Sequence, residues 1–132
     1  MHTRKATLLM TIALWLLASG CYAAVAAKPQ TRCGWFDNST PGNASLRDRD
    51  REWAIAIQGS YEAAGDWPQF EDSQWVPVNG LHGYGCACIK AVVDADTGRV
   101  VSILSARARP LGACRRDRAL KEPLGDPSNG QP

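Results

Sequence analysis

The sequence has little of several residue types on which common catalytic and metal sites depend. Both methionines, Met1 and Met10, lie within the first ten residues, and beyond His2 the only histidine is His82. A copper site with an axial methionine is therefore excluded from the body of the chain. A Ser/His/Asp triad would have to use His82, which lies in a glycine-rich segment with no serine on a strand-turn-helix elbow.

The chain also lacks an excess of one charge once its N-terminal segment is set aside. The 132 residues carry 15 basic and 13 acidic side chains. Removing Arg4 and Lys5 with that segment leaves 13 of each sign. Because nucleic-acid binding depends on clustered cations that release counterions from phosphates, we expect no nucleic-acid partner.

The first 26 residues have the pattern of an export signal. Two basic residues precede the apolar run Ala6–Ala18, which is too short to span a bilayer comfortably. Leu17–Cys21 resembles a bacterial lipobox with Cys21 as the lipidation site, whereas Ala24–Ala26 offers small residues to an ordinary signal peptidase. The apolar run ends next to Cys21, which favours the anchored form.

This pattern divides the chain into three parts. We expect an export signal at 1–26, a single disulfide-stapled domain at 27–123, and a disordered tail at 124–132. Lipoprotein-type cleavage before Cys21 is the alternative end of the export signal. The protein is expected to be bacterial and exported to the periplasm or cell envelope, either soluble or membrane-anchored as a lipoprotein.

Four cysteines remain after either cleavage: Cys33, Cys86, Cys88 and Cys114. An even count in an exported chain predicts two disulfides. Cys86 and Cys88 are two residues apart on a predicted strand, so their parallel side chains do not easily bond to each other. Two pairings stay open: Cys33–Cys86 with Cys88–Cys114, or Cys33–Cys88 with Cys86–Cys114. A redox pair is disfavoured because the Cys-x-x-Cys spacing is absent, and a metal site with His82 because oxidation would consume the thiols.

Alternating hydrophobicity predicts a mainly β fold, with a small α+β arrangement as the alternative. The predicted strands are 53–58, 74–78, 84–93 and 99–106. Pro77 places the second strand at a sheet edge, and Gly98 suits the left-handed position that closes a hairpin of the last two. We expect a loop at 33–46 and a helical turn within 115–121. The expected fold is an antiparallel meander stapled by two disulfides.

The segment Arg47–Glu52 alternates charge strictly. An extended conformation would place its cations on one face and its acids on the other. We interpret it as a solvated, self-neutralising lead into the strand at 53–58. Asp94 and Asp96 begin like a calcium loop, but Gly98 occupies the next ligand position, so no metal is expected there.

The candidate binding residues come from the aromatic side chains and their neighbours. Trp53 belongs to the apolar stripe and is expected in the core. Trp67 follows Asp66 in a predicted loop, where an exposed ring beside an acid suits a sugar or a protein partner. Trp35, in the predicted loop at 33–46, and His82 complete the set of expected partner-binding residues.

Several short motifs are distributed over the body of the chain. They include CGWFDN (33–38), GDWP (65–68), GYGCAC (83–88) and ILS (103–105). In these motifs the sequence resembles an uncharacterised bacterial family of small exported proteins, domain of unknown function 4087. The resemblance implies a common fold and an exported location, and it brings no activity or assigned site.

These observations favour a non-enzymatic envelope module that binds a protein or a cell-wall glycan without a cofactor or metal. One alternative is an inhibitor of a secreted hydrolase. Another is a small carboxylate-dependent hydrolase that would also use His82. That alternative is weaker, because a mature chain of about 106 residues has little material for the cleft that two carboxylates need.

Overall fold

The computed structural model describes residues 27–123; the predictions for the export signal, for Cys21 and for the tail lie outside these residues. The elements in chain order are β1 (Gln30–Asn38), β2 (Ala44–Arg47), β3 (Glu52–Ile57), β4 (Tyr61–Glu62), a 3₁₀ turn (Asp72–Gln74), β5 (Trp75–Asn79), β6 (His82–Asp94), β7 (Arg99–Arg109) and α1 (Leu111–Arg115). The prediction of a mainly β fold is confirmed.

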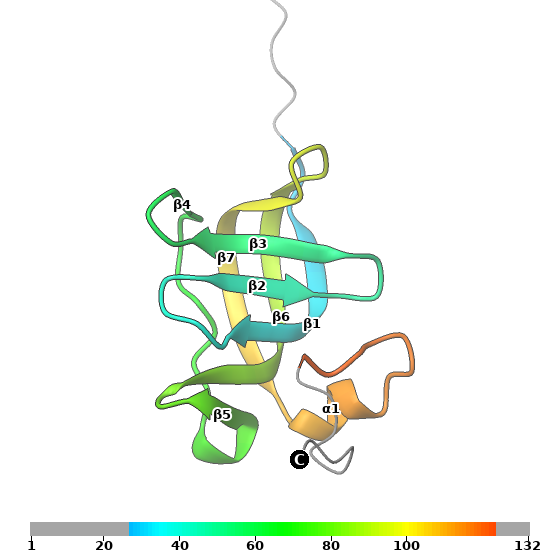
Figure 1. The fold of residues 1–132 in the computed structure, drawn as a ribbon. Coiled ribbons are helices and arrows are strands. Elements are labelled where there is room, and N and C mark those ends of the chain that lie inside the picture. The colour runs from blue at the N-terminus through cyan, green and yellow to red at the C-terminus, as the bar shows by residue number, and fades with distance from the viewer. Residues whose placement is uncertain (1–26, 124–132) are drawn as a thin grey trace, which may run out of the picture.

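Five of the strands close into a barrel (Figure 1). β1 pairs antiparallel with both β2 and β6, β2 pairs with β3, and β6 pairs with β7. The ring closes where β3 and β7 run parallel, with Ala54 opposite Arg99. A partly open, five-stranded Greek-key barrel is the architecture of the OB-fold. Because one pair is parallel, the sheet is mixed. Its strand order departs from a sequential meander, since closure pairs β1 with β6 and β3 with β7, which are remote in sequence.

The barrel interior holds one hydrophobic core, to which every barrel strand contributes. Its largest buried side chains are Phe36, Leu46, Trp53, Ile55, Ile89, Val100 and Ile103. β1 pairs with both β2 and β6, and its backbone comes so close to β2 that only a glycine fits at position 34. A Cβ atom at Gly34 would lie 2.0 Å from the carbonyl oxygen of Arg47.

Two disulfides join the barrel to itself and to the helix. Cys33–Cys88 links β1 to β6 with Cα atoms 4.0 Å apart, and Cys86–Cys114 ties β6 to α1 with Cα atoms 5.7 Å apart. The prediction that Cys86 and Cys88 bond to different partners is confirmed, and the second of the two open pairings is the one present. A small second cluster surrounds the Cys86–Cys114 bridge, formed with Trp35 and Tyr84.

Tyr84 also ties this cluster to the end of the described chain. Its hydroxyl donates to Glu122 Oε1 at 2.8 Å, and Arg115 forms a salt bridge with the same carboxylate at 2.8 Å. Burial and the hydrogen bond to Glu122 raise the pKa of Tyr84 to about 12. The hydroxyl is therefore a hydrogen-bond donor throughout the neutral range.

Several local predictions are confirmed and two are wrong. β3, the β6–β7 hairpin with Gly98 at φ 69°, and β5 at the end of the strand order all agree with the sequence patterns. The predicted loop at 33–46 instead contains most of β1 and part of β2. Trp35 and Phe36 are buried in different clusters, so β1 is covered on both faces and lacks the alternation that identifies a strand. The helix lies at Leu111–Arg115, directly after Pro110, rather than within 115–121.

The charged segment Arg47–Glu52 is largely exposed, as predicted, with the exception of one buried carboxylate around which its turn is built. Asp48 has a side chain only 3% exposed. Its Oδ1 accepts the backbone N–H groups of Asp50 and Arg51 at 2.8 and 2.9 Å. Its Oδ2 accepts Nε1 of Trp53 at 2.9 Å. The carboxylate therefore joins the β2–β3 turn to the core indole.

Two guanidinium groups complete this arrangement. Those of Arg32 and Arg51 lie 4.9 and 4.8 Å from the ring centroid of Trp53, and Arg32 Nη1 also donates to Asp48 Oδ2 at 3.1 Å. Burial alone would raise the pKa of Asp48. The hydrogen bonds from the Arg51 and Asp50 backbone and from Trp53, together with the charge of Arg32, outweigh burial and lower that pKa below its usual value.

Candidate functional site

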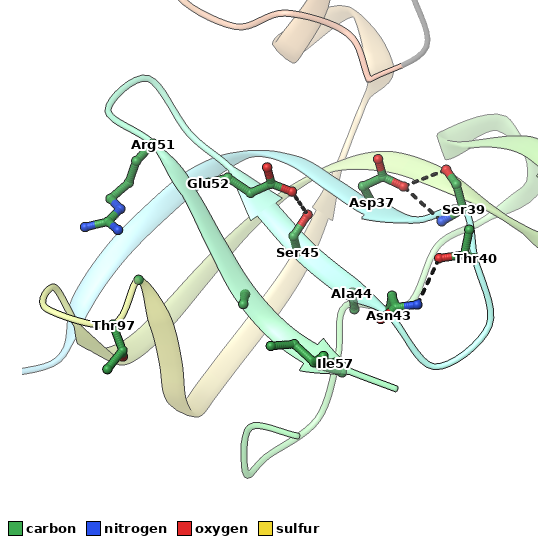
Figure 2. A pocket seen from close by; sticks show the side chains of 13 residues that line it. Asp37, Ser39, Thr40, Asn43, Ala44, Ser45, Arg51, Glu52, Ile57 and Thr97 are labelled. Atoms are coloured by element: carbon green, nitrogen blue, oxygen red, sulfur yellow. Dashed lines mark hydrogen bonds between the residues drawn. The ribbon is translucent and has the colours of Figure 1, made fainter. Parts of the chain in front are cut away.

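The main candidate site is a surface groove over β2 and β3, called here the β2–β3 groove (Figure 2). It has a volume of about 480 Å³. The loop between β1 and β2 forms one side and the turn between β6 and β7 forms another. Its lining includes Asp37, Asn43, Ser45, Glu52, Ala54 and Thr97.

The groove is hollow because the strand positions beneath it carry small side chains. Ser45 of β2 faces Ala54 of β3, and Ala44 faces Ala56 in the next part of the same ladder. The ladder continues to the neighbouring turn, since the backbone N–H of Ala54 donates to the carbonyl oxygen of Gly98 at 2.8 Å. Longer side chains stand only at the rim, so the floor is left open.

The β1–β2 loop is held rigidly at one rim. Asp37 Oδ1 accepts both the backbone N–H and the hydroxyl of Ser39, at 2.9 and 2.6 Å. Nδ2 of Asn38 donates to the carbonyl oxygen of Asn43 at 2.6 Å, and Oδ1 of Asn43 accepts the backbone N–H of Gln58 at 3.0 Å. A loop fixed in this way loses little conformational entropy when a ligand binds.

The opposite rim is fixed by charged side chains. Ser45 Oγ donates to Glu52 Oε1 at 2.7 Å, and Arg47 donates to Glu52 Oε2 at 3.2 Å. Arg51 reaches across to the β6–β7 turn and donates to the carbonyl oxygen of Ala95 at 2.8 Å.

The β6–β7 turn beside this rim is capped by Asp94. The Asp94 carboxylate accepts the backbone N–H groups of Asp96 and Thr97 at 3.0 and 3.4 Å. A hydrogen bond from the Thr97 side chain is the main cause that lowers the pKa of Asp94. Thr97 is thereby held at the edge of the groove.

The lining of the β2–β3 groove consists of hydroxyls, an amide, two carboxylates, one arginine, small apolar side chains and the larger apolar side chain of Ile57. Such a surface offers hydrogen-bond donors and acceptors in fixed positions and suits a polar ligand. The carboxylates of Asp37 and Glu52 would repel phosphate groups. Each already accepts hydrogen bonds from neighbouring side chains, which favours a positioning role over proton transfer.

The residues predicted to bind a partner lie elsewhere. Asp66 and Trp67 line a second groove of about 680 Å³ between the segment 65–74 and β7, called here the β7 groove. Trp67 is half-buried, with its ring centroid 5.7 Å from that of Phe36. Trp35 is fully buried beneath the Cys86–Cys114 cluster, which gives it a packing role.

His82 contacts the start of the β1–β2 loop. Its Nδ1 lies 3.2 Å from Oδ1 of Asn38, whose amide in turn holds the β1–β2 loop. The small residues on the floor of the β2–β3 groove, Ala44, Ser45, Ala54 and Ala56, form no motif in the sequence. Their common signal is a set of small residues at facing positions of two strands, and this emerges only once the strand register is known.

The described residues contain no cluster of three or more His, Cys, Asp or Glu side chains that could hold a metal ion. Within residues 27–123, no helix is long and apolar enough to cross a membrane.

The fold and the groove define a small, disulfide-stapled β-barrel protein with a preorganised polar surface. The chain belongs to the family described as protein of unknown function (DUF4087), whose model matches residues 27–121. The resemblance drawn from the motifs is thus confirmed. No curated protein and no solved structure matches the chain significantly.

Proposed function

We propose that this protein is a non-enzymatic, exported module that binds an oligosaccharide of the cell envelope in the β2–β3 groove. The observation that carries the proposal is the place of the groove. In five-stranded barrels of this order, the face of the second and third strands, with the first and last barrel loops, binds oligonucleotides and oligosaccharides. The β2–β3 groove occupies that face and is bounded by those two loops.

The chemistry of the lining favours a sugar over a nucleic acid. Asp37 and Glu52 add negative charge where a phosphate backbone would require cations. Hydroxyls at Ser45 and Thr97 and the amide at Asn43 suit the dense hydrogen bonding of a glycan. A protein ligand, such as a secreted hydrolase, would need less polarity at the centre of the contact.

The exported setting is supported by the disulfides. Two bridges persist in oxidising compartments such as the periplasm and are rare in the cytosol. The proposal includes attachment to the membrane through a lipid on Cys21. This residue lies outside residues 27–123, which the structure describes.

The test measures binding of soluble peptidoglycan fragments and of chitooligosaccharides by NMR titration. Ala54→Trp fills the floor of the groove, and Val101→Trp is the matched control on β7, where Val101 is 47% exposed. We expect shifts at Asn43, Ser45 and Thr97, with binding lost in Ala54→Trp and kept in Val101→Trp. Equal binding by both variants, or no shift at these residues with any glycan, would contradict the proposal.

A further inference from the structure

A second surface lies along the outer edge of β7. β7 pairs with β6 over its full length. On its other side, β3 contacts it at Arg99, and the single residue Ala64 bonds to it at Val101 and Ile103. Among residues 27–123, no segment pairs with this side from Leu104 to Arg109.

The geometry at the Cys33–Cys88 bridge establishes which residues of β7 direct their backbone N–H and C=O groups away from β6. Its Cα atoms are 4.0 Å apart, the spacing of facing residues that do not exchange backbone hydrogen bonds. Cys88 therefore directs its backbone N–H and C=O toward β7, where it faces Arg107. Because successive residues of a strand direct these groups to alternate sides, Ala106 and Ala108 direct theirs away from β6.

The backbone N–H and C=O groups of Ala106 and Ala108 point into the β7 groove. The groove runs along β7 from Ile103 to Ala108, and the segment 65–74 forms its opposite wall. Figure 1 shows this segment, in green, passing beside β7 between β4 and β5. Six residues of strand span about 20 Å, so the groove has the length of a short extended peptide.

We propose that the β7 groove binds an extended peptide segment of a partner protein, which adds a strand to β7 through Ala106 and Ala108. Only an extended polypeptide offers N–H and C=O groups at the spacing of an open strand edge. The wall formed by the segment 65–74 flanks the open edge, which favours a single extended segment over the edge of a second barrel, whose strands carry their own neighbours. Leu104, 53% exposed next to the groove, offers an apolar contact.

The charges along the groove define the partner further. Asp66 and Glu71 line the wall, whereas Arg107 is the one cation among the lining residues. The wall is therefore acidic, and a segment with a lysine or arginine directed to it is favoured.

The experiment uses the mature chain and a capped heptapeptide in which Val and Thr alternate around a central Lys. We expect millimolar peptide to shift the backbone amides of 104–109 and 65–71 in NMR spectra and to slow hydrogen exchange at Ala106 and Ala108. A peptide with Pro at its second and fifth positions lacks at least one ladder donor whichever set of alternate residues faces β7, so it should cause much smaller shifts. Replacing the central Lys by Glu should weaken binding.

Two protein variants sharpen the result. Ala108→Pro removes one donor that faces the groove and leaves the β6 ladder intact, so the peptide should bind roughly fivefold more weakly, as expected for one hydrogen bond. Ala108→Thr keeps the donor and should bind as the unchanged protein does.

The proposal is overturned if shifts fall outside the β7 groove, if none occur, or if the proline peptide binds equally well. Protection of Ala106 and Ala108 in the free protein, through dimers or through the tail, would assign the groove to another occupant and likewise overturn it. Should Ala108→Pro fail to fold, the comparison of peptides on the unchanged protein decides the question.

Discussion

The buried carboxylate of Asp48 offers the sharpest test of how this fold is held together. Asp48→Asn keeps the shape of the side chain and removes its charge. The amide oxygen can still accept the backbone N–H groups of Asp50 and Arg51. The amide nitrogen, however, then faces two other donors, Nε1 of Trp53 and Nη1 of Arg32, which the carboxylate now accepts at 2.9 and 3.1 Å.

The expected cost follows from these contacts. Trp53 is 2% exposed, so its Nε1 would be left buried without an acceptor, at a cost of about 1 to 3 kcal/mol. Loss of the charged contact to Arg32 adds about 1 kcal/mol, since Arg32 keeps its bond to Asp50 at 2.8 Å. We expect Asp48→Asn to lower the free energy of unfolding by about 3 kcal/mol.

Urea denaturation followed by tryptophan fluorescence measures this change. Asp50→Asn is the matched control, because Asp50 contacts the same arginine through a side chain that is 63% exposed. It should cost less than about 1 kcal/mol. A loss below about 1 kcal/mol for Asp48→Asn, or equal losses for both variants, would refute the account of the β2–β3 turn.

The pH dependence has a definite sign. The pKa of Asp48 is lowered by folding, so its contribution is fully present above the unfolded value of 3.8 and is lost as the pH falls through the lower folded value. The stability difference between the original protein and Asp48→Asn should therefore be constant near neutral pH and shrink below about pH 4. A difference that grows on acidification would contradict the assignment.

Further predictions concern packing, covalent links and anchoring. Trp53→Ala should cost about 3 to 5 kcal/mol in thermal or urea unfolding, and the half-buried Trp67→Ala clearly less; equal costs would place both rings in the core. Replacing Cys86 and Cys114 together by Ala should lower stability by up to about 3.5 kcal/mol, from the entropy of the closed loop, and a non-reducing peptide map of the original protein should link these two residues. Cys21→Ala should release the protein from the membrane fraction or block its processing, whereas an N-terminus found at residue 27 would show ordinary cleavage.

The sequence predicted those parts of the fold that local patterns determine. Turn chemistry at Gly98 identified the β6–β7 hairpin, and Pro77 placed β5 at an edge. The spacing of Cys86 and Cys88 established that they bond to different partners but did not choose between the two pairings. That choice depends on Cys33 facing Cys88 across β1 and β6, a long-range register that no local signal encodes.

The parts that failed depend on tertiary burial. β1 looked like a loop because Trp35 and Phe36 are buried on opposite faces, which removes the alternation of a half-buried strand. Its residues typical of turns have other roles: Gly34 allows close approach to β2, and Asn38 donates a hydrogen bond to Asn43. Asp48 looked solvated because its neighbours alternate in charge, although four donors surround it. The β2–β3 groove was invisible for a similar reason, since its floor is made of small residues that carry no chemical motif.

Both proposed surfaces follow from the single parallel contact between β3 and β7. Near Ala54 and Arg99 this contact brings the β6–β7 turn beside β3 and so closes one side of the β2–β3 groove. β3 pairs with β7 only near Arg99, the isolated bridge from Ala64 follows at Ser102, and the edge of β7 is open beyond Ile103. The surfaces share this origin but no lining residue, so we expect them to act independently. Ala54→Trp should leave binding of the heptapeptide unchanged, and Ala108→Pro should leave glycan binding unchanged. Loss of both activities in either variant would show that the substitution disturbs the barrel itself.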